Sequence, residues 1–435
     1  MVQNVYHCIV VYKILKILQR IHQKELHKKN TVFNMKKSNV HFFSLQKGTI
    51  VVNRKIIEFN SEKCEIPVLV ENRELLCIGN VSNKTTKIQI SSKLGGNAYF
   101  LRTEPEIITL KKNFACEFSV YLTPLYSTTI SSDVMIISKS LSNNKQSTYD
   151  FIINAKTEMN SRLDPTEISI DKKIGEGSFG LVYQGTFRNN LVAIKQMKES
   201  INEAEKMKDF EREVCMLDKF RSKIIVHFYG AVFIPSKNCM VTEFAQFSSL
   251  NDLMIKMKWH QITEKLKIKF IIDAAKGLSY LHTNGILQRD IKPDNILIVS
   301  VERNDQVNAK LTDFGASRNI NMLMTNMTFT KEVGTPNFMA PEVLKGEKYT
   351  TSADVYSFAI TIYECFGWCE AYSKDAFKFP WKIAEFVTAR KRLEKRKNII
   401  EELTRLMEQC WLQNSDERIK INHVVDELQL IRSTR

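Results

Sequence analysis

Short stretches in which apolar and polar residues alternate dominate residues 38–156. Alternation with a period of two is typical of strands that have one buried face, and clusters of turn residues separate these stretches. No helical pattern intervenes. The pattern therefore predicts an all-β domain of about eight strands, namely "GTIVV", "EIPVLV", "KIQI", "AYFLR", "EIITL", "CEFSVYL", "VMIIS" and "YDFII".

The even spacing of these strands favours an antiparallel sandwich of immunoglobulin-like shape. No grouping of His, Cys and Asp residues in it indicates catalysis, so we expect a binding or spacer role. Residues 157–165 are interpreted as a linker that leads into a second domain.

Beyond about residue 166 the pattern changes to further strands for some seventy residues and then to long helical patterns. Apolar residues at helical spacing occur in "DLMIKMKWHQITEKLKIKFIIDAAKGLSYLH" and again near the end of the chain. A small sheet-rich lobe before a larger helical lobe indicates a two-lobed α+β architecture. A cleft between such lobes is a natural ligand site.

The chain has 435 residues, of which 43% are hydrophobic and 26% are charged, as in ordinary soluble globular proteins. Its length predicts two or three domains. The formal net charge is +15, and residues 1–56 carry eleven Lys and Arg residues against one acid, Glu25. The positive charge is therefore concentrated near one end.

Three interpretations of this basic end are open: a solvated tail, contact with an anionic membrane surface, and nucleic-acid binding. No basic stripe with interleaved aromatic residues accompanies it, so we expect no nucleic-acid partner. Lys13, Lys16 and Arg20 interrupt its apolar stretch. Residues 1–37 therefore predict a basic amphipathic segment that lies on a surface rather than crossing a membrane, and no secretory signal pattern is seen. We expect a cytoplasmic or peripheral location.

Nine scattered cysteines argue against a disulfide framework and favour a reducing compartment. Only Cys365 and Cys369 lie close together in the sequence. Because no second pair and no histidine flank them, we expect buried packing rather than a metal site.

Three glycines in "IGEGSFGLVYQG", Gly175, Gly177 and Gly180, stand between two strand-like runs. Glycines allow a backbone to bend tightly and to approach phosphate oxygens closely. Dinucleotide-binding turns share this spacing, but a helix follows them, whereas strand residues follow here. The strand "LVAIK" ends in Lys195, which is either an exposed strand-end charge or a group that holds an anion.

Further candidates lie in three motifs. Glu213, in the helical pattern "DFEREVCMLDKF", is either a solvated acid or an ionic partner that orients Lys195. In "ILQRDIKPDN", Asp290 can accept the proton of a hydroxyl, and Lys292 can neutralise charge on a moving phosphoryl group. Asn295 in that loop and the aspartate of "KLTDFGAS" offer oxygen atoms to a hard cation. Taken singly, each is an ordinary surface residue.

Six motifs occur in order: "GEGSFGLV", "VAIK", Glu213, "QRDIKPDN", "DFG" at 313–315 and "APE" at 340–342. This series resembles the eukaryotic protein kinase family over about residues 166–432. The resemblance implies a bilobal α+β protein kinase fold that uses ATP and Mg²⁺ to phosphorylate protein hydroxyls. The predicted segments are the basic segment 1–37, the immunoglobulin-like sandwich 38–156, the linker 157–165 and the kinase domain 166–432.

The resemblance also implies roles for individual residues. The expected catalytic residues are Asp290, which would be the base, Lys292 and Asn295. Asn295 and Asp313 would hold Mg²⁺, and Lys195, braced by Glu213, would hold the α- and β-phosphates of ATP. The residues expected to contact ATP are Ile174, Gly175, Glu176, Gly177, Ser178, Phe179, Gly180, Val182, Ala193, Lys195, Glu213, Thr242, Glu243, Ala245, Leu297 and Asp313.

Lys292 in "DIKPDN" and Thr335 in "GTPNFMAPE" resemble serine/threonine kinases. The runs "MVTEFAQFSSLNDLM" and "DVYSFAITIYE", with "CW" at 410–411, resemble the tyrosine-kinase-like group, and the sandwich ahead of such a domain resembles protist receptor-like kinases. We therefore predict a serine/threonine protein kinase of intracellular signalling with protein substrates. A pseudokinase scaffold and a dual-specificity kinase are the alternatives.

Gln288 stands where the family usually has a histidine that positions the metal-binding turn, and we expect a modest loss of preorganisation from it. The run "IVSVERNDQVNA" predicts a solvent-facing hairpin. The resemblance implies a buried pair between Glu342 and Arg418 and a brace from Asp354 to the catalytic loop. Arg289 indicates a regulatory phosphate on the segment after "DFG", with a hydroxyl-rich loop lacking phosphate as the alternative. Candidate acceptors are Ser317, Thr325, Thr328 and Thr330.

Overall fold

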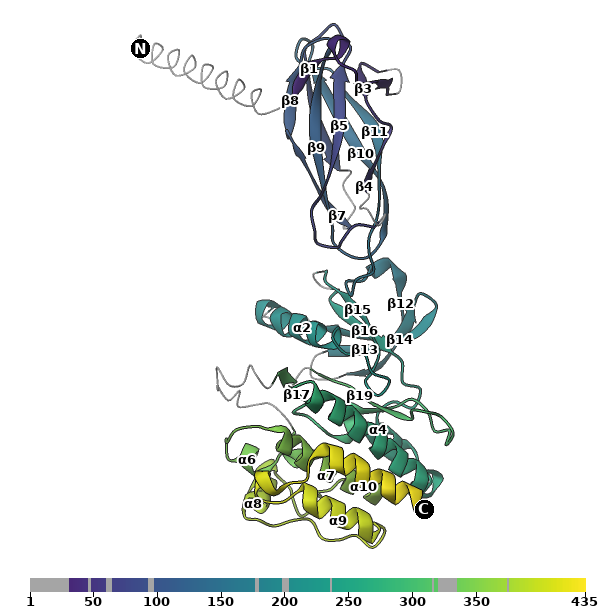
Figure 1. The fold of residues 1–435 in the computed structure, drawn as a ribbon, viewed down its shortest axis with the longest axis vertical. Coiled ribbons are helices and arrows are strands. Elements are labelled where there is room, and N and C mark those ends of the chain that lie inside the picture. Colours follow the sequence, from purple (N-terminus) through teal and green to yellow (C-terminus); the bar gives the residue numbers. More distant parts are fainter. Residues whose placement is uncertain are drawn as a thin grey trace, which may run out of the picture. The chain divides into compact units, whose positions relative to one another are not determined.

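The computed structural model describes residues 31–45, 48–59, 65–92, 98–176, 180–197, 203–234, 237–314, 317–319, 335–373 and 375–435. The chain divides between Glu167 and Ile168 into two units, the N-terminal unit and the C-terminal unit, and each is described by itself (Figure 1). Most of the predicted basic segment, residues 1–30, lies outside the described residues. Among the described residues, no helix has both the length and the apolar character needed to cross a bilayer.

The N-terminal unit contains two β-sheets. The first has the order β1-β9-β5-β3-β2, with β7 also paired to β9, and the second has the order β4-β11-β10-β6-β8. Neighbouring strands are antiparallel except for β4, which runs parallel to β11. The strands are β1 (Val32–Asn34), β2 (Phe43–Ser44), β3 (Ile50–Val52), β4 (Ile56–Phe59), β5 (Asn72–Asn80), β6 (Thr86–Ser92), β7 (Tyr99–Glu104), β8 (Ile107–Leu110), β9 (Phe114–Pro124), β10 (Thr129–Ser140) and β11 (Gln146–Lys156), and a 3-10 turn, η1 (Met35–Lys37), follows β1.

Side chains from both sheets share one hydrophobic core. Phe118, Val120 and Leu122 are buried at alternate positions of β9, as are Phe151 and Ile153 of β11. This alternation is the predicted period of two, with Ser119 and Tyr121 between the buried residues of β9 and the exposed Ile152 between those of β11. Because a buried side chain of this kind contributes about 2 kcal/mol, the paired strands and the core stabilise each other.

Most of the predicted strand runs form strands, but "EIPVLV" does not, and that prediction is wrong. Ile66 makes only an isolated bridge to Thr157, and Leu69 has φ +62°, which ends an extended backbone. The pattern also fails to indicate β5, where adjacent Leu75 and Leu76 break the alternation. The first sheet begins with β1, inside the segment that the sequence assigns to residues 1–37.

Residues 157–164 are held against the N-terminal unit. Thr128 Oγ1 donates to Asp164 Oδ2 at 2.9 Å, and Asp164 Oδ1 accepts from the backbone nitrogen and hydroxyl of Thr166 at 2.9 and 2.6 Å. The Leu163 side chain is buried. The predicted linker is therefore, as far as Asp164, an ordered part of this unit.

The C-terminal unit begins with an antiparallel sheet of order β12-β13-β14-β16-β15. Its strands are β12 (Ile168–Glu176), β13 (Gly180–Phe187), β14 (Asn190–Met197), β15 (Phe228–Val232) and β16 (Cys239–Glu243). The helix α2 (Glu203–Leu217) follows β14, and its buried side chains Phe210, Val214 and Leu217 have the spacing that the sequence predicts for this helix.

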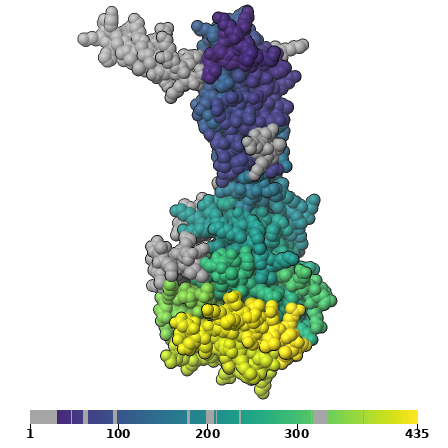
Figure 2. All heavy atoms as spheres, viewed as in Figure 1, coloured from purple at the N-terminus to yellow at the C-terminus, as the bar shows by residue number. Residues whose placement is uncertain are grey.

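Helices dominate the remainder of this unit. The buried centre consists of α4 (Glu264–Thr283) and α7 (Thr351–Gly367), and Thr263 caps α4 by accepting from Leu266 N. The other helices are α3 (Leu250–Lys256), α6 (Pro341–Leu344), α8 (Pro380–Thr388), α9 (Glu401–Cys410) and α10 (Ile421–Ser433). Short 3-10 turns of this unit are η3 (Trp259–Gln261), η4 (Pro293–Asn295), η5 (Pro336–Phe338) and η6 (Ser415–Glu417), while η2 (Pro165–Glu167) ends the N-terminal unit. Figure 2 shows the last helices, in yellow, covering a broad part of one face of this unit.

Two short two-stranded sheets complete the C-terminal unit. One pairs β17 (Ile286–Leu287) with β20 (Arg318–Asn319), and the other pairs β18 (Ile296–Ile298) with β19 (Ala309–Leu311). The predicted solvent-facing hairpin is confirmed between β18 and β19, where residues 302–306 are exposed. Its base is fixed because Asp273 Oδ2 accepts from Asn308 N at 2.8 Å and from Lys269 Nζ at 2.7 Å.

Candidate active site

One face of the small sheet gathers several predicted ATP contacts. In the strand register, Val182 lies opposite Lys195, and Ala193 lies opposite Thr242. Ala193 and Lys195 are two positions apart on β14, so all four side chains share one face of the sheet. Gly175 lies opposite Val182 on β12 and extends this face.

The glycine loop is described only in part, because Gly177, Ser178 and Phe179 lie outside the described residues. At Gly180, a Cβ atom would come within 1.8 Å of the Gln196 carbonyl oxygen, so close packing of the hairpin itself requires a glycine. A Cβ at Gly175 would meet nothing within 4 Å. Glu176 is exposed and forms an ion pair with Lys173 at 2.8 Å.

The Lys195 ammonium lies between two carboxylates. Its Nζ is 3.2 Å from Oε1 of Glu213, on α2, and 3.6 Å from Oδ1 of Asp313, after β19. Burial disfavours the charge on Lys195, but the negative charges of Asp313 and Glu213 outweigh it and hold its pKa above the ordinary value. Burial raises the pKa of Glu213. The predicted juxtaposition of these three residues is therefore present.

The predicted reacting loop forms a second cluster. Asp290 Oδ2 lies 2.7 Å from Lys292 Nζ and accepts from Asn295 Nδ2 at 3.0 Å. Asp290 Oδ1 accepts from the Thr335 hydroxyl at 3.0 Å, and that hydroxyl accepts from Lys292 at 2.8 Å. The carboxylate is therefore oriented by three side chains from two segments of the chain.

Asn295 and Asp313 lie at the end of the same hairpin. β18 follows Asn295 and pairs with β19, which precedes Asp313, and Thr312 N donates to Asn295 O at 3.0 Å. Because the Asn295 amide nitrogen bonds to Asp290, its carbonyl Oδ1 is the atom left for a cation. Asp313 has φ +56°, a left-handed backbone that turns the chain at this point.

A second layer of contacts holds both clusters. Gln288 is fully buried, and its Nε2 donates to the backbone oxygens of Thr312 and Asp313, each at 3.0 Å. Asp354, also fully buried, accepts from the backbone nitrogens of Gln288 and Arg289 at 3.0 and 2.9 Å. The predicted brace from Asp354 to the catalytic loop is confirmed.

Asp354 has two further partners that the sequence does not indicate. Tyr349 OH donates to its Oδ1 at 2.7 Å, and His282 Nε2 lies 2.9 Å from its Oδ2. Burial raises the pKa of Tyr349 well above its ordinary value, and the nearby Asp354 charge adds to this effect. Neither residue belongs to a recognisable motif, so only the fold reveals them.

The other expected ATP contacts lie on several elements. Thr242 and Glu243 end that strand, and Ala245, just beyond, is buried. Leu297, on β18, bridges to Ser249, while Ile174, on β12, is 43% exposed. Ile174, an expected ATP contact, thus has an exposed side chain.

The predicted pair between Glu342 and Arg418 is confirmed. Arg418 donates from both terminal nitrogens to the two Glu342 oxygens, at 2.6 and 2.7 Å, and both side chains are buried. Of the two neighbouring cysteines, Cys365 is buried as predicted, but Cys369 is exposed, so that prediction is wrong for Cys369. Among the described residues, no group of three or more His, Cys, Asp and Glu side chains is arranged to hold a metal.

Of the candidate phosphate acceptors, only Ser317 is described, since Thr325, Thr328 and Thr330 lie outside the described residues. Ser317 is 2% exposed, and its hydroxyl donates to Gln288 Oε1 at 3.1 Å. A buried and bonded hydroxyl is a poor phosphate acceptor in this conformation. Arg289 Cζ lies 5.6 Å from the centre of the Tyr349 ring.

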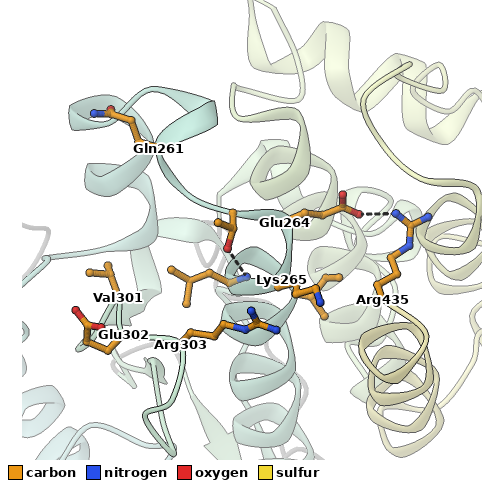
Figure 3. Close-up of a pocket in the computed structure, with 10 residues that line it drawn as sticks. Gln261, Glu264, Lys265, Val301, Glu302, Arg303 and Arg435 are labelled. Carbon is orange, nitrogen blue, oxygen red and sulfur yellow. Dashed lines mark hydrogen bonds and ion pairs between the residues drawn. The ribbon is translucent and has the colours of Figure 1, made fainter.

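A separate hollow of about 710 Å³ lies at the start of α4 (Figure 3). Its rim holds the ion pair between Glu264 and Arg435 at 3.1 Å, and Lys265 and Arg303 lie on the same rim. None of the residues that line it belongs to the predicted site. Charges of both signs line the hollow, so it does not specify one ligand.

Comparison with known proteins agrees with this geometry. Residues 168–428 match the family described as protein tyrosine and serine/threonine kinase. The chain is 32% identical over 314 residues to the probable serine/threonine-protein kinase gdt2 of Dictyostelium discoideum, covering 72% of this chain and 18% of that protein. It is 34% identical over 272 residues to the serine/threonine-protein kinase STY17 of Arabidopsis thaliana, covering 62% and 46%.

It is also 35% identical over 264 residues to the putative serine/threonine-protein kinase/receptor R818 of Acanthamoeba polyphaga mimivirus, covering 60% of this chain and 15% of that protein. The chain thus spans less than a fifth of the length of gdt2 and R818. The matched family covers nearly all of the C-terminal unit, where both clusters lie. By its sequence, this chain belongs to the protein tyrosine and serine/threonine kinase family.

Proposed function

We propose that the chain is a serine/threonine protein kinase of the tyrosine-kinase-like group, which transfers the γ-phosphate of ATP to protein hydroxyls. The observation that carries the proposal is the convergence of Lys195, Glu213 and Asp313 within 3.6 Å, next to a loop that orients Asp290. Relatives named serine/threonine-protein kinases support the choice of acceptor, as does the contact of Lys292 with Thr335.

Asp290 is the proposed catalytic base. A substrate hydroxyl next to it gives its proton to the carboxylate while its oxygen bonds to phosphorus and the bond from phosphorus to the ADP oxygen breaks. Lys292, 2.7 Å from Asp290 Oδ2, provides positive charge beside the reacting groups. Lys195 binds the α- and β-phosphates, and Glu213 keeps its ammonium in place.

The chemistry of Asp313 and Asn295 fits Mg²⁺, which prefers oxygen ligands and needs few protein groups when phosphate oxygens supply others. Asn295 keeps its carbonyl oxygen for this purpose because its nitrogen bonds to Asp290. When bound, Mg²⁺ would neutralise charge on the phosphates. This chain's own contribution is to fix the two oxygen atoms on adjacent ends of one hairpin.

The experiment is phosphate transfer by the full chain from labelled ATP to a generic basic protein. Lys195→Ala and Asp290→Ala should each lower kcat at least about 100-fold, because each removes a group that acts in the reaction. Phosphoamino acid analysis of the product should show phosphoserine and phosphothreonine. Full activity in both variants would discredit the mechanism, and phosphotyrosine in the product would favour dual specificity.

A pseudokinase scaffold is the second candidate, because Gln288 replaces the usual histidine. It predicts that the chain binds ATP and Mg²⁺ without turnover. Binding measured by calorimetry, in parallel with the transfer assay, separates the two functions. Binding without detectable transfer would replace the enzyme with the scaffold.

For the N-terminal unit we propose an immunoglobulin-like sandwich with a binding or spacer role, supported by two sheets around one core. An experimental structure of the full chain, compared with immunoglobulin domains, tests this fold. We also propose that the basic segment 1–37 rests on an anionic membrane surface, that the protein is cytoplasmic or peripheral, and that it has no nucleic-acid partner. Sedimentation with anionic liposomes, with and without residues 1–30, which precede β1, tests the anchor, and equal partitioning of the two chains would contradict it.

A further inference from the structure

An ion pair joins the small sheet to the helical part of the C-terminal unit. Lys310 Nζ, on β19, donates to both carboxylate oxygens of Glu243, on β16, at 2.6 and 2.7 Å. The side chains are only 15% and 22% exposed. A pair that is largely shielded from water is screened less by salt than a surface pair and holds its geometry better.

Glu243 is itself held in position by the loop before β15. The backbone nitrogen of His227 donates to Glu243 Oε1 at 2.7 Å, and Glu243 N donates to the His227 oxygen at 2.9 Å. The Glu243 carboxylate is therefore fixed relative to the small sheet. Lys310 reaches this fixed carboxylate from the hairpin whose end carries Asp313.

The ion pair lies close in the sequence to Lys195 and Asp313, the residues proposed to hold phosphate and metal. On β14, Val192 is the cross-strand partner of Glu243, and Lys195 follows Val192 by three positions. Asp313 likewise follows Lys310 by three positions. In an extended chain three residues span about 10 Å, so the pair is close enough to set how these two elements meet.

The Lys195 and Asp313 contact at 3.6 Å coexists with the Lys310 and Glu243 contact in one conformation. Both contacts connect the small sheet to the segment from β19 to Asp313. With the Lys310 and Glu243 contact in place, the segment that carries Asp313 cannot rotate freely against the small sheet. The distance between Lys195 and Asp313 is therefore maintained.

We propose that Lys310 is a positioning residue for catalysis: by pairing with Glu243 it sets the spacing between Lys195 and Asp313. The inference rests on the proposed kinase function and adds a residue to which the site prediction gives no role. Lys310 touches neither substrate nor metal in this assignment. It acts through the segment that carries Asp313.

The test uses the full chain with Lys310→Met, Glu243→Gln, the double variant and the conservative Lys310→Arg. Lys310→Met should lower kcat about tenfold and weaken binding of ATP with Mg²⁺, and Glu243→Gln should do the same to a smaller extent. The double variant should lose no more kcat or binding than Lys310→Met, because the single variant already removes the contact between Lys310 and Glu243. Lys310→Arg, which keeps the cation, should stay within about threefold of the unchanged protein.

The matched control is Lys382→Met, since Lys382 pairs with Glu385 at 3.0 Å on the exposed surface of α8. It should leave kcat and binding unchanged, and thermal unfolding of every variant shows that it is folded. Unchanged kcat and binding in a folded Lys310→Met, or additive losses in the double variant, would overturn the inference. If the unchanged protein binds nucleotide but transfers no phosphate, the proposed function fails, and the binding comparison alone decides the role of Lys310. If it binds no nucleotide, both fail.

Discussion

Gln288 donates from its Nε2 atom to the backbone oxygen of Asp313 at 3.0 Å, although the two residues are 25 positions apart. The same nitrogen donates to Thr312 O, and the Gln288 Oε1 atom accepts from the Ser317 hydroxyl. All the hydrogen-bonding atoms of the amide are therefore used, and its orientation is fixed. Gln288 can therefore hold the turn at Asp313 as the usual histidine would, but its amide does not titrate as an imidazole does.

Gln288→Leu should lower kcat about 10- to 100-fold and raise the Mg²⁺ concentration needed for half-maximal activity, because two buried carbonyl oxygens lose their donor. Gln288→His, which retains a donor, should stay within about threefold of the unchanged protein. Steady-state kinetics across a Mg²⁺ series measures both effects. An unchanged Mg²⁺ dependence in Gln288→Leu would contradict the positioning role.

A buried carboxyl in α7 should make stability depend on pH. Glu364 is 6% exposed, and burial raises its pKa to about 7, with repulsion from Asp294 and Glu370 adding to the effect. The folded protein therefore binds this proton more tightly than the unfolded chain, whose carboxyl keeps an ordinary pKa. Proton binding by Glu364 therefore contributes favourably to the free energy of unfolding below a pH of about 4.5, and this contribution is lost as pH rises through about 7.

In the structure, Ala371 N donates to Glu364 Oε1 at 2.8 Å. Glu364→Gln keeps an oxygen that can accept this hydrogen bond but has no carboxyl group to titrate. At pH 8 it should raise the free energy of unfolding by up to about 3 kcal/mol relative to the unchanged protein, with no gain near pH 4.5. Thermal unfolding across this pH range measures the difference. Glu385→Gln, on the exposed surface, is the control, and equal pH profiles for the two variants would count against a buried titrating group.

The effects of changing Glu342 and Arg418 on the free energy of unfolding should be strongly coupled. Glu342→Gln should cost about 3–5 kcal/mol of the free energy of unfolding, because it leaves the buried Arg418 guanidinium without a counter-charge. Glu342→Leu combined with Arg418→Met should cost less than the two single changes added together. Urea unfolding of the set gives the coupling energy, and simple additivity would show that the two side chains act independently.

Asp164→Ala should destabilise the N-terminal unit by about 2 kcal/mol, since Thr128 Oγ1 and Thr166 N lose their acceptor in a partly buried place. Asp171→Ala, a change of the same chemistry at an exposed position of β12, is the control. Calorimetry on the full chain should show a lower midpoint only for Asp164→Ala. If the midpoint stays the same, residues 157–164 do not stabilise the unit.

Thiol labelling should distinguish the described cysteines. Cys215 and Cys369 are exposed and should react within minutes with a thiol reagent at pH 8. Burial raises the pKa of Cys239 to about 11 and of Cys365 to about 12, so both thiols are inaccessible and un-ionised. Mass spectrometry before and after unfolding checks this order. Rapid modification of Cys365 in the folded protein would contradict its burial.

The sequence predicts best where a motif or a regular pattern marks the residues. The resemblance to protein kinases implies that Glu213 braces Lys195 and that Arg418 pairs with Glu342, and both pairs are present. Alternation predicts most strands of the N-terminal unit, but a pattern with a period of two does not reveal β5, whose consecutive residues are all buried toward its end.

Motifs and alternation do not predict contacts between distant segments that share no motif. Lys310 and Glu243 are 67 positions apart, and nothing in either local stretch indicates the other. The exposure of Cys369 is a similar case, because it depends on the chain leaving α7 through the left-handed Trp368. The burial of Ser317 likewise follows from its contact with Gln288 rather than from its neighbours.

The parallel pairing of β4 with β11 bears on how the N-terminal unit is made in the cell. One of its early strands finds its partner in the last strand, and β1 likewise pairs with the late strand β9. Non-local pairs of this kind form slowly because a long loop must close first. During synthesis β1 and β4 therefore stay without these partners until β9 and β11 have been made, and this interval is when a nascent chain would depend most on a chaperone.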